Sequence, residues 1–353
     1  MIPTEPIGSI PRPQALLDAM GELAAGRIAQ GEMNRLYDSA LQDTISRLEA
    51  TGSPVISDGE QTKPSFVTYP IHGLGNLASG GMAIPFADGH QRQLPRLTSG
   101  PFRYGTFADQ YLQEAQKYAH VPVKQAVISA SALSLLYPQD GIEGYSRDAF
   151  IADLLSQAEL DIRRCLRRGA HNVQIDFTEG RLAIKLDPSK GVLKSFVELN
   201  NQVLNRFTPE ERTKIGVHTC PGGDHDSTHS ADIDYADLLP DLFALNAGRF
   251  YLQLASEGDR AKVLGLIEQV AKPHQKIFVG VIDPINPTVE TSEEVRDRVL
   301  EAAEYLPIAQ LGTTDDCGFS PFADDTSTAR ETAFEKIRAR VTGTRMASEK
   351  LGL

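Results

Sequence analysis

The 353-residue sequence contains no tryptophan, only three cysteines and no long apolar run. A membrane-spanning helix needs roughly 20 consecutive apolar residues, so none is expected. Three cysteines in a chain of this length do not form a disulfide framework, and an odd number fits a reducing compartment. The first 13 residues lack a basic region followed by an apolar one, so we expect no secretory signal and a cytoplasmic protein.

Positive charge is also scarce, because 35 Lys and Arg residues face 47 Asp and Glu residues. The resulting formal charge of -12 would repel a phosphate backbone or an anionic lipid surface, which excludes nucleic-acid and membrane partners. Hydrophobic residues make up 41% of the chain, enough for two ordinary domains or one large α/β domain. The sequence leaves the oligomeric state open, including a homo-oligomer.

Short runs rich in Val and Ile alternate with segments of helical period from residue 120 onward, which predicts parallel βα units. Residues 54–60 predict one more strand, preceded by an amphipathic helix around 32–51. A first strand is expected within 5–13, although prolines weaken it. The remaining predicted strands are 123–130, 172–177, 214–220, 249–255, 276–283 and 308–314. Eight strands predict an α/β fold with a single (β/α)8 TIM barrel over residues 1–353.

Two other segments define the predicted organisation. Residues 150–169 place apolar side chains at the spacing of one buried helix face, and Gly169 then ends the helix. Residues 66–120, rich in Gly, Pro and aromatics, are too long for a βα connection. We therefore expect an insertion over one end of the barrel, with a hairpin. A doubly wound open sheet is the rival fold, but no GxGxxG motif follows the first strand.

Polar side chains close almost every predicted strand. In a TIM barrel the chemistry lies at the C-terminal ends of the strands, so these side chains predict a functional mouth. They are Ser9, Glu60, Asp176, His218, Cys220, Gln253, Asp283 and Cys317.

The segment KIGVHTCPGG (214–223) carries two of these side chains on one strand. His218 and Cys220 are two residues apart, so both point to the same side of a strand. An imidazole and a thiolate can share a tetrahedral zinc ion, with Cys317 as a third ligand across the mouth. The alternative is packing, which we expect for Cys165 on its apolar helix face.

Two further sets of residues are open to two interpretations. Asp224, His225, Asp226 and His229 are a competing metal candidate, but their polar neighbours favour a solvated loop with Ser230 or Asp232 as the next helix cap. Glu60 and Asp176 are expected to bind a substrate ammonium or to act as acid or base. Their alternative role is a salt bridge with an arginine such as Arg12 or Arg181.

Six motifs, taken in chain order, resemble a known family. IGSIPRP, SDGEQT, VQIDF, GVHTC, GVID and DDCGF are similar to the catalytic half of cobalamin-independent methionine synthase. They also resemble its shorter relatives, the core methionine synthases and epoxyalkane:coenzyme M transferase. The resemblance implies a TIM barrel with zinc on His218, Cys220 and Cys317. It also implies that Ile7, Gly8, Ser9, Glu60 and Asp176 line the pocket for the amino-acid end of homocysteine.

The chain departs from the family pattern at points that affect the zinc and the alkyl donor. Gln253 stands where methionine synthases have a glutamate ligand, so the fourth zinc ligand would be neutral. The folate-stacking tryptophan and the N-terminal half of the longer enzyme have no counterpart. Methyl-folate, a methyl corrinoid and an epoxide therefore stay open as donors.

The expected function is a zinc-dependent thiol alkyltransferase, with methyl transfer to homocysteine as the first choice. Opening of an epoxide by coenzyme M is the alternative. The sulfonate of coenzyme M would need a base such as Arg12 to bind it. The alkoxide formed from the epoxide would need an acid to protonate it, such as Asp283, His225 or Glu179. A uroporphyrinogen decarboxylase-like lyase and a metal-free binding barrel are further alternatives.

Overall fold

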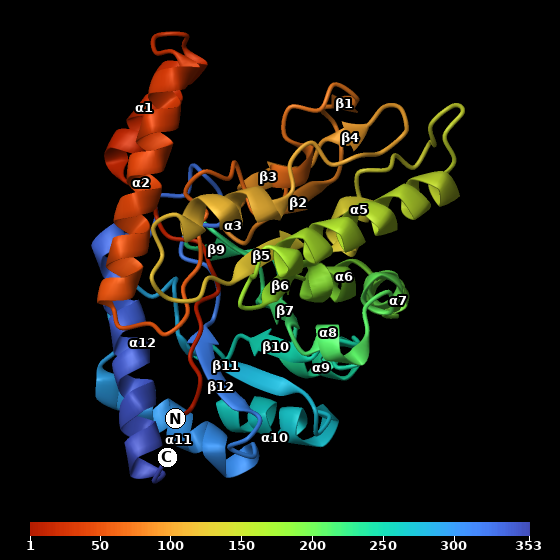
Figure 1. The fold of residues 1–353 in the computed structure, drawn as a ribbon. Coiled ribbons are helices and arrows are strands. Elements are labelled where there is room, and N and C mark those ends of the chain that lie inside the picture. The colour runs from red at the N-terminus through yellow and green to blue at the C-terminus, as the bar shows by residue number, and fades with distance from the viewer.

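The computed structural model describes residues 1–353 and centres on a parallel six-stranded sheet (Figure 1). The strand order is β12-β11-β10-β7-β6-β5, with each strand pairing in parallel with its neighbour. These strands are β5 (Gln125–Ile128), β6 (Val173–Asp176), β7 (Ile215–Thr219), β10 (Arg249–Leu252), β11 (Lys276–Ile282) and β12 (Leu311–Asp315). Five of them lie inside the Val- and Ile-rich runs, and β12 extends one residue beyond the run 308–314, which confirms the predicted α/β fold.

Two extended segments occupy the outer edges of this sheet. Thr4 forms a parallel bridge with Thr313 of β12, and Ile56 forms one with Val123 beside β5. Thr4 lies next to the first predicted strand, and Ile56 lies within the second. With the six regular strands, these two segments give eight strand positions. Prolines lack the N–H that a ladder requires, which explains why the first segment forms a bridge rather than a strand. The two edges meet where the Ile10 amide donates to the Gly59 carbonyl at 3.0 Å.

The helices cover the sheet and account for the intervening sequence. Their bounds are α1 (Gln14–Ala24), α2 (Gln30–Ala50), α3 (Ala108–Gln116), α4 (Ala130–Ser134), α5 (Arg147–Arg167), α6 (Glu179–Leu186), α7 (Gly191–Leu204), α8 (Pro209–Arg212), α9 (Tyr235–Leu242), α10 (Arg260–Val270), α11 (Ser292–Tyr305) and α12 (Arg330–Lys350). Helix α2 confirms the predicted amphipathic helix. Helix α5 ends before Gly169, whose φ of +83° lies in the left-handed region that favours glycine.

One hydrophobic cluster of 70 buried residues extends from Ile2 to Ala347. Cys165 is fully buried in it, so its predicted packing role is confirmed. Inside the sheet, Tyr251 and Phe278 stack at 4.7 Å between ring centroids and form a small separate cluster with Ile7. The hairpin of α1 and α2 projects from the body with its own apolar contacts (Figure 1).

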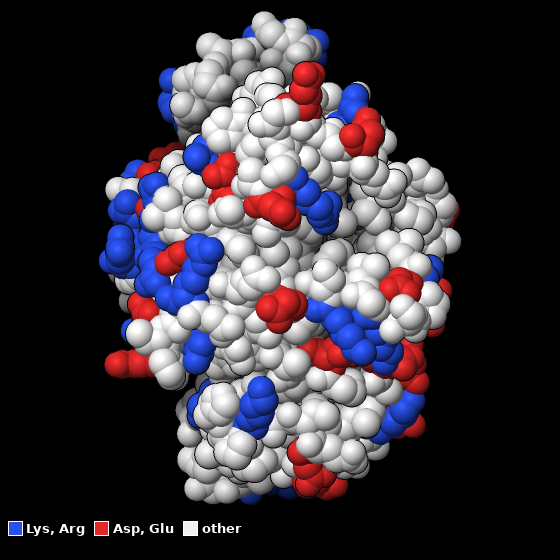
Figure 2. Space-filling model, turned by 90° about the vertical axis from the view of Figure 1, so that its right-hand side faces the viewer, with Lys and Arg blue, Asp and Glu red and all other residues white.

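One face of the molecule carries mixed charge (Figure 2), although the whole chain has a formal charge of -12. On the face shown in Figure 2, basic and acidic side chains are interspersed among a larger uncharged area. No helix is long and apolar enough to cross a lipid bilayer.

The predicted insertion contains two short antiparallel strand pairs after a 3-10 turn (Tyr69–Ile71). They are β1 (Leu77–Ala78) with β4 (Arg96–Leu97), and β2 (Ala83–Pro85) with β3 (Gln91–Gln93). The turn between β2 and β3 rests on a third hairpin, because the Ala87 amide donates to the Thr228 carbonyl at 2.9 Å. Helix α3, at the end of the predicted insertion, packs instead against β5 and α5.

That third hairpin corrects the expectation of a solvated loop at 224–230. Its strands are β8 (Gly223–Asp224) and β9 (Ser227–Thr228), and both Asp224 and His229 are buried. The insertion covers this segment and supplies the partners that its polar sequence needs. The helix that follows is capped by Asp234, which accepts from the Ala236 amide at 2.9 Å, and not by Ser230 or Asp232.

Candidate metal centre

The three predicted metal ligands come together at the C-terminal edge of the sheet. His218 lies near the end of β7, Cys220 follows that strand, and Cys317 follows β12 two residues after its end. One candidate ligand atom from each residue lies within 4.8 Å of the other two, and the Cys220 and Cys317 sulfurs are 3.2 Å apart without a disulfide. His218 and Cys220 are buried. Residues 97 positions apart in sequence thus form one cluster.

Two thiols this close suit a cation between them. The neighbouring Cys220 sulfur and burial raise the pKa of the Cys317 thiol well above its ordinary value. Without a positive charge, two thiolates at this separation would repel each other in a dry environment. Thiolate and imidazole are the ligands that zinc prefers in proteins, and three protein ligands are typical of a catalytic zinc site. The donor set therefore fits a zinc ion.

Gln253 occupies a position beside this cluster. Thr219 pairs with Leu252 in the register of β7 and β10, so the next residues, Cys220 and Gln253, are neighbours on adjacent strands. The Gln253 amide nitrogen donates to Ser256 Oγ at 2.8 Å and to Glu257 Oε1 at 3.0 Å. Its Oε1 atom is buried and has no hydrogen-bond partner. An unpartnered buried oxygen fits the role of a neutral fourth ligand.

Asp176 supports the histidine from the neighbouring strand. Its Oδ1 atom lies 3.1 Å from His218 Nδ1 and accepts from Gln174 Nε2 at 2.7 Å. A carboxylate on one imidazole nitrogen fixes the ring, and the other nitrogen, Nε2, lies 3.3 Å from the Asp316 carbonyl and would be the one to face a metal. Both hydrogen bonds of the Asp176 side chain use Oδ1, so Oδ2 remains for a ligand in the cavity.

Glu60 lies across the cavity with a lysine partner that sequence reasoning did not identify. Lys63 is buried and donates to Glu60 Oε1 at 3.0 Å, with Asp58 at 3.8 Å. Burial raises the pKa of Glu60, and the Lys63 charge opposes that shift. The ion pair uses one Glu60 oxygen and leaves Oε2 without a protein partner. The spacing of three residues between Glu60 and Lys63 was the available sequence signal.

A small cavity joins these groups to the N-terminal segment. We call it the metal pocket; its volume is about 30 Å³. Its lining includes Ile7, Gly8, Ser9, Glu60, Asp176, His218, Cys220 and Cys317. The structure thus brings together the three predicted ligands and five of the six predicted substrate-binding residues.

The sequence was compared with known protein families and with characterised proteins. Residues 2–341 match the family described as "Cobalamin-independent synthase, Catalytic domain". The chain belongs to this family. It is 22% identical over 351 residues to a methionine synthase of Sulfurisphaera tokodaii, covering 99% of this chain and 94% of the relative. It is 21% identical to a methionine synthase of Saccharolobus solfataricus, covering 99% and 96%. The resemblance found in the six motifs is confirmed.

Two solved structures share the fold. A B12-independent methionine synthase from Shewanella sp. W3-18-1 in complex with selenomethionine superposes with a TM-score of 0.77 at 18% identity, covering 99% of both chains. A putative B12-independent methionine synthase from Listeria monocytogenes gives 0.73 at 20% identity, covering 98% of this chain and 99% of that one. These two structures show the fold, and the family match over residues 2–341 makes the chain an enzyme of the cobalamin-independent methionine synthase family.

Arg12, the remaining predicted substrate-binding residue, lies behind the cavity lining. It is buried and donates to the Glu60 carbonyl at 2.7 Å, the Lys63 carbonyl at 2.8 Å and the Phe322 carbonyl at 3.1 Å. Its guanidinium ties three mouth segments together and does not line the metal pocket. In this family member, Arg12 therefore supports Glu60 from the backbone side.

The three residues considered as acids lie at different places. Asp283 does not line the metal pocket, and its Oδ1 accepts from the Ile285 amide at 3.0 Å. His225 is in the β8–β9 turn, 3.1 Å from an Arg92 nitrogen. Glu179 is buried beside a second small cavity, where Ser129 Oγ donates to its Oε1 at 2.6 Å and Oε2 has no partner. Burial raises the pKa of Glu179.

Asp316 is a functional neighbour that sequence reasoning missed. Its carboxylate accepts from the backbone amides of 254, 255 and 256, each at 2.8 Å, and from Ser256 Oγ at 2.7 Å. It directly precedes Cys317 and thereby connects that ligand to the loop that follows Gln253. Its approach requires Gly280, because a Cβ there would lie 1.8 Å from Asp316 Oδ1. The acidic pair in DDCGF was the only sequence signal.

Proposed function

We propose that this enzyme catalyses zinc-dependent methyl transfer to homocysteine, giving methionine. The observation that supports the proposal most directly is the cluster of His218, Cys220 and Cys317 in the metal pocket. Gln253 would supply the fourth ligand through its unpartnered Oε1. Zinc, when bound, lowers the pKa of a coordinated thiol so that the thiolate exists at neutral pH.

The free carboxylate oxygens of the metal pocket support an amino-acid thiol. Asp176 Oδ2 and Glu60 Oε2 have no protein partner and belong to residues that line the pocket together with the ligands. An α-ammonium group is the natural partner of two such oxygens. Ile7, Gly8 and Ser9 line the same pocket and supply a backbone edge for the rest of the amino acid.

In the reaction, the homocysteine sulfur forms a bond to the methyl carbon, and the bond between that carbon and the donor breaks. The electron pair of the broken bond leaves with the donor atom, and the thiol proton passes to solvent. Asp176 and Glu60 act by orienting the amino acid so that the sulfur faces the methyl group. The buried walls of the pocket exclude water, which would compete for the methyl group.

Coenzyme M fits these walls less well than homocysteine. A sulfonate needs an unengaged cation, whereas Arg12 binds backbone carbonyls and Lys63 pairs with Glu60. The free oxygens that face the ligand are carboxylates, which repel a sulfonate.

Metal analysis and a substrate assay test the proposal together. Purified protein should contain close to one zinc per chain and should convert homocysteine to methionine with a methyl donor, followed by mass spectrometry. Coenzyme M should give far less methylated product under the same conditions. A protein that binds no zinc when supplied with it, or one that prefers coenzyme M, would refute the assignment.

A further inference from the structure

The metal pocket is too small for both substrates of a transfer reaction. Its volume is about 30 Å³, whereas pockets for small molecules span roughly 300–1,000 Å³. Homocysteine and a methyl donor must meet at one sulfur atom, so the body of the donor needs a second space that reaches the cluster. Two open cavities share lining residues with a small cavity beside the metal pocket.

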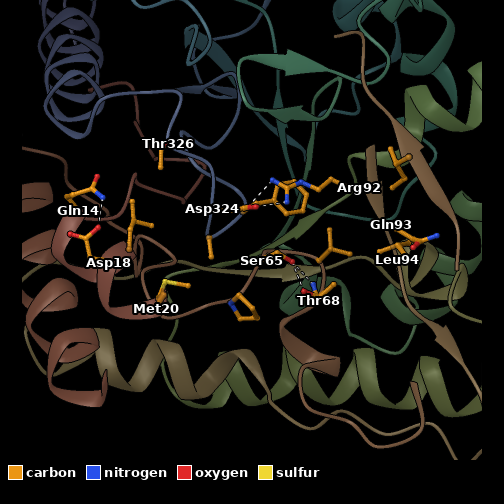
Figure 3. A pocket seen from close by; sticks show the side chains of 16 residues that line it. Gln14, Asp18, Met20, Ser65, Thr68, Arg92, Gln93, Leu94, Asp324 and Thr326 are labelled. Atoms are coloured by element: carbon orange, nitrogen blue, oxygen red, sulfur yellow. Dashed lines mark hydrogen bonds and ion pairs between the residues drawn. The ribbon is translucent and has the colours of Figure 1, made fainter. Parts of the chain in front are cut away.

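The first cavity, which we call the outer pocket, has a volume of about 660 Å³. Figure 3 shows its labelled side chains converging from separate segments: Gln14, Asp18 and Met20 of α1, Gln93 of β3, and Asp324 and Thr326 of the segment before α12. A small inner cavity of about 50 Å³ connects the outer pocket to the metal pocket. It shares Val67, Ile84, Arg92, Leu94 and Phe322 with the outer pocket, and Phe66, Thr178, Gly222 and Gly223 with the metal pocket.

An aromatic pair divides the outer pocket from the metal pocket. Phe322 lines the outer pocket, Phe66 lines the metal pocket, and their rings meet edge to face at 5.6 Å between centroids. Both side chains are only partly buried. Rings in edge-to-face contact leave no gap for a methyl group, so one of the two side chains must turn aside before a donor in the outer pocket can reach Cys220 and Cys317.

The second open cavity, which we call the side pocket, is less well connected. Its volume is about 800 Å³ and its lining includes Asp140 and Val192. It shares only Leu135 with the inner cavity, against five residues for the outer pocket. The continuity of the lining therefore favours the outer pocket.

The charges of the outer pocket disfavour an anionic ligand. Arg92 is its only basic lining residue, and it pairs with both Asp224 and Asp324, with nitrogen–oxygen distances of 2.9 Å to each. Asp18 adds a further negative charge on the exposed side of α1. The lining thus carries two carboxylates and one cation, and that cation is already paired with Asp324 and with the buried Asp224, so a polyanionic tail would be repelled.

We propose that the outer pocket binds the methyl donor and that this donor is uncharged or cationic rather than polyanionic. The inference rests on the proposed function and names the substrate class of its second site. The apolar lining, including Leu17, Val67 and Phe322, holds the body of the donor, while its reactive carbon enters where Phe66 or Phe322 turns aside.

A matched pair of filling variants tests the location. Leu17→Trp narrows the outer pocket, and Val192→Trp does the same in the side pocket. We expect Leu17→Trp to raise the KM for the donor about tenfold, equivalent to ~1.4 kcal/mol, with the KM for homocysteine and the zinc content unchanged. Val192→Trp should leave all three values at wild type. The reverse pattern, or equal effects, would overturn the location.

A second pair of variants, each of which reverses the charge of one aspartate, tests the class of donor. This test remains available if Leu17→Trp does not fold. The donors compared are methylcobalamin, S-methylmethionine and methyltetrahydropteroyl triglutamate. The triglutamate should be the poorest of the three, and Asp18→Lys should lower its KM roughly fivefold, as expected for a two-unit charge change about 8 Å away in water. Asp140→Lys, the same change in the side pocket, should have no effect.

The outcomes separate this inference from the proposed function. A triglutamate that is the best donor, or no turnover with any of the three donors in a protein whose zinc binds homocysteine, overturns the donor assignment alone. A protein without zinc overturns the proposed function instead.

Discussion

Two buried polar clusters lie at opposite ends of the same sheet, and they differ in how their polar atoms are paired. At the N-terminal end, Glu5 is surrounded by partners: Arg249 at 2.9 Å, Tyr251 at 2.6 Å, Asn172 at 2.8 Å and Lys124 at 3.5 Å. Burial would raise the pKa of Glu5, but His171, the charges of Lys124 and Arg249, and the Tyr251 hydroxyl together hold it well below its ordinary value. We call this set the base cluster.

At the C-terminal end, the metal centre leaves its polar atoms without such partners. The sulfurs of Cys220 and Cys317 face each other, Gln253 Oε1 has no partner, and the second oxygens of Asp176 and Glu60 are free. Lys124 Nζ of the base cluster also lacks a hydrogen bond, but it lies 3.5 Å from the Glu5 carboxylate, which supplies its counter-charge. The buried Gln253 oxygen has no such neighbour, so its retention points to a ligand that would pair with it. We therefore expect the base cluster to stabilise the fold and the mouth to be the end where ligands would bind, as in other TIM barrels.

The largest effect should come from removing a sulfur ligand. Cys220→Ser and Cys317→Ser should each lower zinc affinity by roughly three orders of magnitude or more, because one of three strong ligands is lost. The measurement is a chelator competition assay for zinc, with thermal unfolding alongside. Cys165→Ser is the matched control and should reduce the stability but not the zinc content. Zinc loss in the control would contradict the assignment of ligands.

Removing the Glu5 charge from the base cluster should lower the stability of the protein and leave its zinc affinity unchanged. Glu5→Gln leaves Lys124 and Arg249 without their counter-charge and should lower the free energy of unfolding by about 3–5 kcal/mol. Zinc affinity should stay at the wild-type value. Urea titration gives the stability. If Glu5→Gln instead removed zinc while leaving stability intact, the two ends would not divide the roles as described.

The pH dependence of the free energy of unfolding gives a second test of the stabilising role of the base cluster. Burial lowers the pKa of Lys124 to about 8, although Glu5 opposes the shift. A lysine of the unfolded chain titrates near 10.4, so between about pH 8 and 10.4 the unfolded chain binds the extra proton. The contribution of Lys124 to stability should therefore rise with pH across this window, by up to about 3 kcal/mol. Urea titrations give the free energy of unfolding of wild type and of Lys124→Met at about pH 8 and about pH 10.4. The difference between the two proteins should change by that amount between the two pH values. An unchanged difference would refute the shift in the Lys124 pKa.

A smaller effect is expected from the support of the metal centre. Asp316→Asn replaces an acceptor oxygen with an amide that faces backbone N–H groups, so Cys317 and the loop after Gln253 lose their link. Zinc affinity should fall by about 10–100-fold, the usual range for residues that orient ligands. Cobalt substitution should show a changed absorption spectrum. Ser256→Ala removes one of the four hydrogen bonds and should lower the affinity about threefold; an unchanged spectrum in Asp316→Asn would refute the link.

Much of the fold was predictable from local sequence pattern. The six Val- and Ile-rich runs became β5, β6, β7, β10, β11 and β12, and the apolar spacing of 150–169 became α5. Parallel strands that are buried on both faces need continuous runs of apolar residues, and helices buried on one face need apolar residues every three or four positions. Both signals can be read from a short stretch of sequence. Polar residues at the strand ends also predicted which side chains share the mouth, because parallel strands bring their C-terminal ends to one edge.

Other features depended on contacts that no local pattern encodes. The segment 224–230 was expected to be solvated, yet the insertion buries Asp224 and pairs it with Arg92, 132 positions away. Lys63 was not anticipated as the partner of Glu60, nor Asp316 as the anchor of the loop after Gln253. A side chain's partner is set by which elements fold beside it, and that is a long-range property.

The sequence by itself determined the strand and helix order, the family and the set of metal-competent side chains. The motifs are short and local, and the residue types restrict the chemistry. Only the tertiary structure decided which of these side chains meet: it brought Cys317 to 3.2 Å from Cys220, and it left Arg12 and Asp283 outside the metal pocket. Distances of this kind depend on sheet register and loop packing, which arise only when the whole chain folds.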